Sequence, residues 1–212
     1  MRIDSAKVTG VKREHTVDIH TSLQSYAASL QSTLDTLPMA DLTAVVEALL
    51  DAGDRGSTIF ILGNGGSAAT ASHFACDLAK GAQRPGVRPF RVIALTDNVP
   101  LMTAWGNDTS YDRIFAEQLR PLVQADDVVV GISGSGSSPN VLEAMRVARE
   151  AGAYTIGWTG FKGGKLKNLV DVCVVVPSNS MEQIEDVHLV MEHAVCTTLR
   201  TIRQPADAFV VR

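Results

Sequence analysis

The stretch that decides the fold of this chain is Ile59-Phe60-Ile61-Leu62-Gly63-Asn64-Gly65-Gly66-Ser67. Its apolar first half is typical of a buried strand, its second half is a glycine-rich turn closed by a serine, and residues 68–80 then have a helical pattern. Glycines let backbone N–H groups approach an anion closely, and the N-terminus of a helix adds partial positive charge. The stretch is therefore typical of a phosphate-binding turn between a strand and a helix.

A second turn of the same kind follows later in the chain. The apolar run 128–132 leads into Ser133-Gly134-Ser135-Gly136-Ser137-Ser138, again before a helical pattern. In open parallel sheets, ligands bind beyond the carboxyl ends of the strands, so we expect both turns to converge on one ligand. The second turn carries four hydroxyl groups and no adjacent lysine. This composition favours a sugar monophosphate over a nucleoside triphosphate.

The whole chain reads as alternating strands and helices. We expect two leading helices at 16–34 and 41–52, strands at 58–62, 90–95, 127–132, 154–158 and 172–176, and helices near 67–80, 110–122, 138–151, 163–169 and 181–203. Near-continuous apolar strands between helices predict an α/β fold, a three-layer αβα sandwich with a five-stranded parallel sheet. The length predicts one domain over 1–212, in which 1–55 forms an N-terminal helical extension.

Several classes of protein are disfavoured by composition and missing motifs. The net charge of −4 argues against nucleic acid as a partner. The Walker A pattern is absent and the first turn is not GxGxxG, so no nucleotide cofactor is expected. No apolar run approaches the ~20 residues of a membrane span, and the first twenty residues lack a signal-peptide core. Three widely spaced cysteines without a CxxC pattern indicate free thiols. We expect a cytoplasmic protein without a membrane partner.

Six motifs in a fixed order carry a resemblance to a known family. They are Gly63-Asn64-Gly65-Gly66-Ser67, His73-Phe74-Ala75, Gly106-Asn107-Asp108, Ile132 to Ser138, Thr159-Gly160-Phe161-Lys162-Gly163-Gly164-Lys165, and Ile184-Glu185-Asp186-Val187-His188. Together they resemble the sugar isomerase (SIS) domain, and more narrowly the phosphoheptose isomerase family, over almost the whole chain. This is far more specific than any one motif.

The resemblance implies an activity and a substrate site. It implies a homotetramer, with sites at subunit interfaces, that converts sedoheptulose 7-phosphate to D-glycero-D-manno-heptose 7-phosphate through an enediol, for heptose and surface-glycan precursor synthesis. The family's phosphate-binding serines fall on Ser67, Ser133, Ser135 and Ser138. The glycines of the same turns, Gly65, Gly66 and Gly134, complete the predicted cradle. The family's substrate-contacting residues fall on Asn64 and Asp97, and we add Glu185.

Aldose–ketose isomerisation needs a base for the transferred proton and an acid or electrophile at the oxygens. His73 and Asp77 are four residues apart and share one face of the helix that begins at the first turn. In the family, a histidine and a carboxylate on this helix join a glutamine and a histidine on the last helix, and some members bind zinc with these four. The matching residues are His73, Asp77, Glu185 and His193.

Two of these four residues depart from the family pattern. The usual glutamate is the shorter Asp77, and the usual glutamine is Glu185, which adds a negative charge. The extra carboxylate favours a divalent metal, so we expect one zinc ion per site. The expected catalytic residues are His193 as acid and either Glu185 or Asp77 as base. Glu185 and His193 are separated by roughly 12 Å and ~80° on an ideal helix, so they meet only through reaching side chains or shared subunits.

Two other functions remain open from the sequence. Some relatives are non-enzymatic, initiator-associating tetramers that regulate replication, but these lack the first-helix carboxylate and the last-helix histidine. Asp77 and His193 are both present here, which favours an enzyme. The second alternative is an isomerase or a binder of another phosphosugar, which the departures at Asp77 and Glu185 allow. His188 is interpreted as a structural histidine or one that faces a neighbouring subunit.

Overall fold

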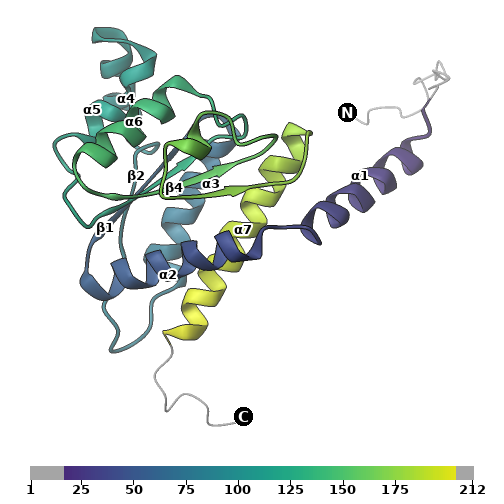
Figure 1. The fold of residues 1–212 in the computed structure, drawn as a ribbon, viewed down its shortest axis with the longest axis horizontal. Coiled ribbons are helices and arrows are strands. Elements are labelled where there is room, and N and C mark those ends of the chain that lie inside the picture. The colour runs from purple at the N-terminus through teal and green to yellow at the C-terminus, as the bar shows by residue number, and fades with distance from the viewer. Residues whose placement is uncertain (1–16, 204–212) are drawn as a thin grey trace, which may run out of the picture.

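A computed structural model of the protein, which describes residues 17–203, has an all-parallel five-stranded sheet in the order β2-β1-β3-β4-β5 (Figure 1). The strands are β1 (Thr58–Gly63), β2 (Arg91–Ala94), β3 (Val128–Ile132), β4 (Tyr154–Thr159) and β5 (Val172–Val175). All five lie within about two residues of the predicted ranges. The predicted three-layer α/β fold is confirmed.

The strand order places the two glycine-rich turns side by side. From β1 the chain crosses to β2 on one side, and β3 then pairs with β1 on the other, with Phe60 opposite Val129 and Gly63 opposite Ile132. The connections therefore leave β1 and β3 in opposite directions, which makes a topological switch point at their carboxyl ends. Both predicted phosphate-binding turns begin there.

Two helical layers cover the sheet (Figure 1). On one face, α2 (Met39–Arg55), α3 (Gly66–Cys76) and α7 (Met181–Ile202) share a core with Ile59, Ile61 and Trp158. On the other face, α5 (Ala116–Leu119) and α6 (Pro139–Glu150) share a core with Phe60 and Leu62. Successive side chains of a strand point to opposite faces, so burial of both faces requires the continuous apolar run of β1.

The helices between 99 and 122 differ from the prediction. The structure has α4 (Val99–Asp108), which was not predicted, and the predicted helix 110–122 is reduced to a 3-10 turn, η2 (Tyr111–Arg113), and α5. The Asn98 side chain accepts a hydrogen bond from the backbone N–H of Leu101, and Pro100 lies in the first turn of α4. An N-cap followed by an early proline is a start signal for a helix, and it was missed.

The predicted helix 163–169 was also wrong. Only a 3-10 turn, η3 (Leu166–Asn168), forms there. Gly163 and Gly164 have φ of 86° and 54°, which excludes a right-handed helix at these two residues. This loop instead lies against the serine-rich turn.

The helix that leaves the first turn changes its hydrogen-bonding pattern midway. After Cys76 the chain forms a π-helix, η1 (Asp77–Gly81), in which the N–H of Ala82 donates to the Asp77 carbonyl at 2.8 Å. Single π-turns within α-helices are rare and occur frequently at functional sites. The π-helix begins at Asp77, which is one of the predicted site residues.

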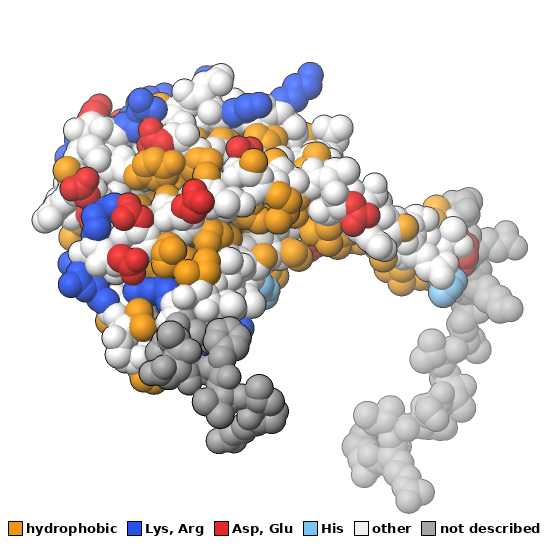
Figure 2. All heavy atoms as spheres, turned by 60° about the horizontal axis from the view of Figure 1, so that its bottom comes forward, with side chains coloured by type: hydrophobic (Ala, Val, Ile, Leu, Met, Phe, Trp, Pro, Cys, Tyr) orange, Lys and Arg blue, Asp and Glu red, His pale blue; other side chains and the backbone are white. Residues whose placement is uncertain are grey.

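The first helix, α1 (Ile19–Leu34), extends away from the sandwich (Figure 1). It contacts α7 through the Tyr26 hydroxyl, which donates to Asp186 at 2.6 Å, and through Gln183, which donates to Ser29 at 2.9 Å. Its apolar side chains are largely exposed, Leu23 by 67%, and Figure 2 shows hydrophobic side chains along this projection. Within residues 17–203, no helix is long and apolar enough to cross a membrane.

Candidate functional site

The first turn holds its shape through glycines that leave no room for a side chain. A Cβ on Gly63 would lie 2.8 Å from the Ser67 Cβ. A Cβ on Gly66 would lie 2.6 Å from Glu185 Oε2, and Gly65 has a φ of 55°. The carboxylate of Glu185 therefore lies directly on the backbone at the N-terminus of α3, where the partial positive charge of the helix favours an anion.

The second turn is fixed by backbone hydrogen bonds to its neighbours. Ser133 N–H donates to the Trp158 carbonyl at 2.9 Å, and Gly160 N–H donates to the Gly134 carbonyl at 2.9 Å. Gly136 has a φ of 62°, and a Cβ there would lie 2.1 Å from the Gly163 carbonyl oxygen. The turn and the 160–164 loop thus meet backbone to backbone, which leaves the serine hydroxyls to face the cavity.

The two turns and the start of α7 enclose a cavity of about 130 Å³. It is lined by Asn64, Ser67, Ile132, Ser133, Gly134, Ser135, Ser138, Met181 and Glu185. The Ser133 and Ser138 hydroxyls lie 3.1 Å apart within hydrogen-bond distance. Seven of the predicted substrate residues thus line one small polar cavity at the carboxyl ends of β1 and β3.

Three predicted substrate residues, Gly65, Gly66 and Asp97, do not line this cavity. The Asp97 carboxylate accepts a hydrogen bond from Ser72 on α3. Asn64 lines the cavity, and its side chain exchanges hydrogen bonds with Asn140, at 2.8 and 2.9 Å, and accepts one from the Tyr111 hydroxyl at 3.0 Å. No sequence pattern pointed to Asn140 or Tyr111, because their contacts with Asn64 depend on the packing of α6 and η2 beside the first turn.

A second group of side chains lies where α3 and η1 pack on α7. It consists of His73, Asp77, Glu192 and His193, whose donor atoms all lie within 4.8 Å of one another. His73 Nε2 is 3.9 Å from Asp77 Oδ1, and His193 Nε2 is 3.3 Å from Glu192 Oε2. The two imidazole rings meet edge to face with centroids 5.0 Å apart. Imidazole and carboxylate donors in this number can hold a divalent metal.

The membership of this group differs from the predicted set in one residue. Within one subunit His73, Asp77 and His193 lie together, Glu192 lies with them, and Glu185 does not belong to this group. Helical rise explains the difference, since residues eight apart on α7 are separated by roughly 12 Å while adjacent residues are not. Glu185 lines the serine cavity instead. No sequence pattern pointed to Glu192, which stands beside His193 in the middle of the last helix.

Glu192 is fully buried, at 0% exposure. Burial raises the pKa of its carboxyl group, and the neighbouring His193 opposes that shift. Its Oε1 accepts a hydrogen bond from the Cys196 thiol at 3.8 Å, whereas its Oε2 has no hydrogen-bond partner within residues 17–203. Burial also raises the pKa of Cys196, so this thiol stays protonated and donates.

His188 does not take part in either group. It is fully buried between them on α7, and its Nε2 donates to the Thr159 carbonyl at 3.2 Å. Burial lowers the pKa of His188 to about 4, so the ring is neutral at physiological pH. This agrees with the structural role that was one of its two interpretations.

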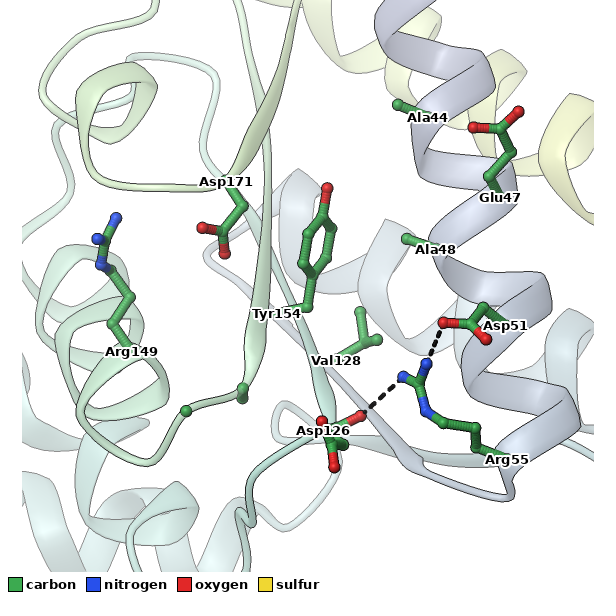
Figure 3. Close-up of a pocket in the computed structure, with 12 residues that line it drawn as sticks. Ala44, Glu47, Ala48, Asp51, Arg55, Asp126, Val128, Arg149, Tyr154 and Asp171 are labelled. Carbon is green, nitrogen blue, oxygen red and sulfur yellow. Dashed lines mark hydrogen bonds and ion pairs between the residues drawn. The ribbon is translucent and has the colours of Figure 1, made fainter.

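A larger cavity of about 710 Å³ lies at the opposite edge of the sheet, between α2 and the amino ends of β3 and β4 (Figure 3). Both arginines that line it are already engaged by the protein. Arg55 pairs with Asp51 and donates to the Asp126 carbonyl at 3.1 Å, and Arg149 donates to the Leu169 carbonyl at 2.6 Å. The smaller serine-lined cavity is therefore the stronger candidate for substrate.

Comparison with known proteins places the chain in a family. The family described as SIS domain matches residues 23–160. The chain is 46% identical over 142 residues to a phosphoheptose isomerase of Aliarcobacter butzleri, covering 67% of this chain and 75% of that protein. It is 40% identical over 181 residues to the one of Pelobacter propionicus, covering 84% and 94%.

Solved structures give the same answer. A phosphoheptose isomerase from Neisseria gonorrhoeae superposes with a TM-score of 0.79 at 32% identity, over 87% of this chain and 100% of that one. The enzyme from Francisella tularensis superposes with a TM-score of 0.81 at 30% identity, over 87% and 100%. The two superpositions span the whole length of both relatives.

Proposed function

Because the chain belongs to the phosphoheptose isomerase family of SIS-domain proteins, we propose that it interconverts sedoheptulose 7-phosphate and D-glycero-D-manno-heptose 7-phosphate. The observation that carries the proposal is the cavity in which the hydroxyls of Ser67, Ser133, Ser135 and Ser138 converge at the N-terminus of α3. Hydroxyl donors and a helix N-terminus suit a phosphate monoester. The glycines of the two turns let the phosphate approach the backbone.

We assign the base to Glu185. Its carboxylate lines the phosphate cavity and rests on Gly66, whereas Asp77 belongs to the metal-binding group, where a bound cation would make it a poor base. In the forward reaction Glu185 takes the proton from C1 of the ketose and returns it to C2 of the enediol. One further proton moves from the C1 hydroxyl to the C2 oxygen. Without a bound cation, His193 is the assigned acid for that oxygen.

We propose that a zinc ion binds the group that contains His73, Asp77 and His193. The donor set fits, because two imidazoles and carboxylate oxygens are common zinc ligands and their donor atoms already lie within 4.8 Å of one another. When bound, the ion would supply a Lewis acid that polarises the substrate carbonyl. His193 would then be a ligand of the ion, and the ion would replace His193 as the acid at the substrate carbonyl.

The proposal extends to assembly and location. We propose a single domain over 1–212, a homotetramer with sites at subunit interfaces, and a cytoplasmic protein that serves heptose and surface-glycan precursor synthesis. Support for the assembly comes from α1, whose apolar residues Val17, Ile19 and Leu23 are each more than half exposed. A second copy of the chain would cover them. Light scattering after gel filtration measures the subunit number directly.

Turnover is the direct test. Purified protein is incubated with sedoheptulose 7-phosphate, with and without zinc, and the appearance of the aldose is followed by NMR. Five- and six-carbon ketose phosphates in parallel separate an isomerase of another sugar. Absence of turnover on all of them, together with specific binding to a replication initiator protein, would establish the non-enzymatic alternative. His193→Ala and Asp77→Asn are expected to abolish turnover and leave the oligomer intact.

A further inference from the structure

Asn64 and Asn140 form a reciprocal pair of side-chain amides that joins the two glycine-rich turns. Asn64 follows β1 in the first turn, and Asn140 is the second residue of α6, which begins directly after the serine-rich turn. The Asn64 Nδ2 donates to Asn140 Oδ1 at 2.8 Å, and the Asn140 Nδ2 donates back to Asn64 Oδ1 at 2.9 Å. Asn140 is only 1% exposed and does not line the serine cavity, so it does not touch a ligand there.

The backbone of α6 decides which way both amides point. The N–H of Val141, which can only donate, donates to Asn140 Oδ1 at 2.9 Å. Reversing the Asn140 amide would turn its NH₂ group against this donor, so the contact fixes Asn140. The Asn140 NH₂ group then requires an acceptor opposite it, which fixes the oxygen of Asn64 in turn. The Tyr111 hydroxyl donates to that same oxygen at 3.0 Å.

These contacts leave Asn64 with one hydrogen-bonding group to offer. A side-chain amide has two N–H donors and one oxygen with two acceptor sites. Asn140 and Tyr111 occupy both acceptor sites of Asn64, and Asn140 takes one of its two N–H groups. The second N–H has no partner within residues 17–203, and Asn64 lines the cavity. Asn64 therefore meets a ligand as a hydrogen-bond donor and not as an acceptor.

We propose that Asn140 is a positioning residue of the phosphosugar site, which holds the Asn64 amide so that Asn64 donates to an oxygen of the bound substrate. This inference deepens the proposed function and rests on it for the identity of the substrate. A displacement of about 1 Å in a positioning group can cost 10²-fold in rate, so a rigid amide pair between the two turns has a catalytic consequence. A purely structural role would be confined to the N-terminus of α6, where the Asn140 oxygen satisfies an N–H that has no partner within the helix.

Asn140→Asp separates these two roles. The carboxylate keeps an acceptor for the Val141 N–H and is favoured in the first turn of a helix, but it cannot donate to Asn64. We expect kcat/KM for sedoheptulose 7-phosphate to fall by about 10- to 100-fold. Asn168→Asp makes the same substitution at an exposed asparagine outside the cavity, and it should keep the wild-type kcat/KM. Wild-type kcat/KM in Asn140→Asp would reduce Asn140 to its structural role and overturn the proposal.

A double-mutant cycle tests whether Asn140 acts through Asn64. Asn64→Ala removes the amide that Asn140 positions, so in that background Asn140→Asp should change kcat/KM by less than about twofold. A carboxylate that repelled the phosphate directly would cause the same loss with or without Asn64, and equal losses would overturn the proposal. Asn140→Ala, which adds no charge, repeats the cycle and should give the same result. Circular dichroism and thermal unfolding check that each variant is folded.

Calorimetric titration with sedoheptulose 7-phosphate separates this inference from the proposed function. A protein that binds this sugar phosphate without turnover, with a Kd about tenfold higher in Asn140→Asp, would retain the inference and lose the proposed activity. A protein that converts the sugar equally well with and without the Asn140 amide would retain the activity and lose the inference. A protein that neither binds nor converts it would lose both.

Discussion

The amino and carboxyl ends of the parallel strands, here called the amino edge and the carboxyl edge of the sheet, carry cavities of different character. At the amino edge, about 710 Å³ is lined by charged residues, and both arginines among them pair with Asp51 or with backbone carbonyls (Figure 3). At the carboxyl edge, only about 130 Å³ is enclosed, but serine hydroxyls, a helix N-terminus and the Glu185 carboxylate point into it. Free hydrogen-bonding capacity, rather than volume, distinguishes a binding site from a surface hollow.

The largest expected difference between the edges concerns carboxylates. Glu185→Gln, at the carboxyl edge, should lower kcat by about 1,000-fold, because a general base contributes 10²–10⁴-fold. Glu47→Gln removes a carboxylate that lines the amino-edge cavity. It should leave kcat unchanged. Steady-state kinetics on sedoheptulose 7-phosphate measure both, and equal losses would contradict the assignment of the site.

The next largest effect concerns pH and the helix that carries the site. In the folded protein the pKa of His188, which lies on α7, is about 4, so its ring is neutral at physiological pH. In the unfolded chain the same ring titrates near 6.5. Between pH 6.5 and 4 the His188 ring binds a proton in the unfolded chain but not in the folded protein. The contribution of His188 to the free energy of unfolding is therefore full above pH 6.5 and is lost as the pH falls toward 4. Between pH 7 and 5 the loss is about 2 kcal/mol.

Urea unfolding at the two pH values measures this loss. His188→Gln can keep the hydrogen bond to Thr159 but cannot titrate, so its unfolding free energy should depend less on pH by that amount. A pH dependence of His188→Gln identical to the wild type would show that this ring does not cause the acid sensitivity.

A smaller effect is expected within the serine-rich turn itself. Ser135 lines the cavity and Ser137 does not, although both are exposed and two residues apart. Ser135→Ala should raise KM about tenfold through loss of a hydrogen bond to the charged phosphate. Ser137→Ala should leave KM unchanged. Similar KM values for the two variants would mean that the phosphate binds elsewhere.

The smallest effect is expected at the amino edge. The Tyr154 side chain lies at the centre of the larger cavity (Figure 3), where burial, and then Asp171, raises its pKa. Tyr154→Phe should change kcat/KM by less than a factor of two and stability by no more than about 0.5 kcal/mol, as for most surface substitutions. A loss of activity comparable to that of Ser135→Ala would give this cavity a function.

Features that depend on local sequence pattern could be predicted, and features that depend on tertiary packing could not. The strands and both turns could be predicted because their signals lie in adjacent residues. A strand buried on both faces is a continuous apolar run, and a turn that approaches a ligand is rich in glycine and serine. Helical spacing placed His73 and Asp77 on one face, where the structure has them, and Ser67 lines the cavity at the turn that its motif indicated. Glu192 and Asn140 were not predicted, because they meet these residues only through the packing of α7 on α3 and of α6 on the first turn.

The wrong helix at 163–169 has a similar explanation. Gly163 and Gly164 adopt positive φ where the loop lies against Gly136, a contact with a segment 27 residues earlier in the chain. The missed α4 is different, because its signals at Asn98 and Pro100 are local and were available. The first error is one of long-range packing, the second one of interpretation.

The contact between the serine-rich turn and the 160–164 loop constrains how this site can evolve. Gly136 and Gly164 each lack room for a single additional carbon, since each would meet the backbone of the other loop at 2.5 Å or less. Neither glycine can be substituted unless the backbone of the opposite loop moves, so the two loops are structurally coupled. Replacing the exposed Ser135 requires no such backbone movement. The frame that presents the serines is therefore more tightly constrained than the serines themselves.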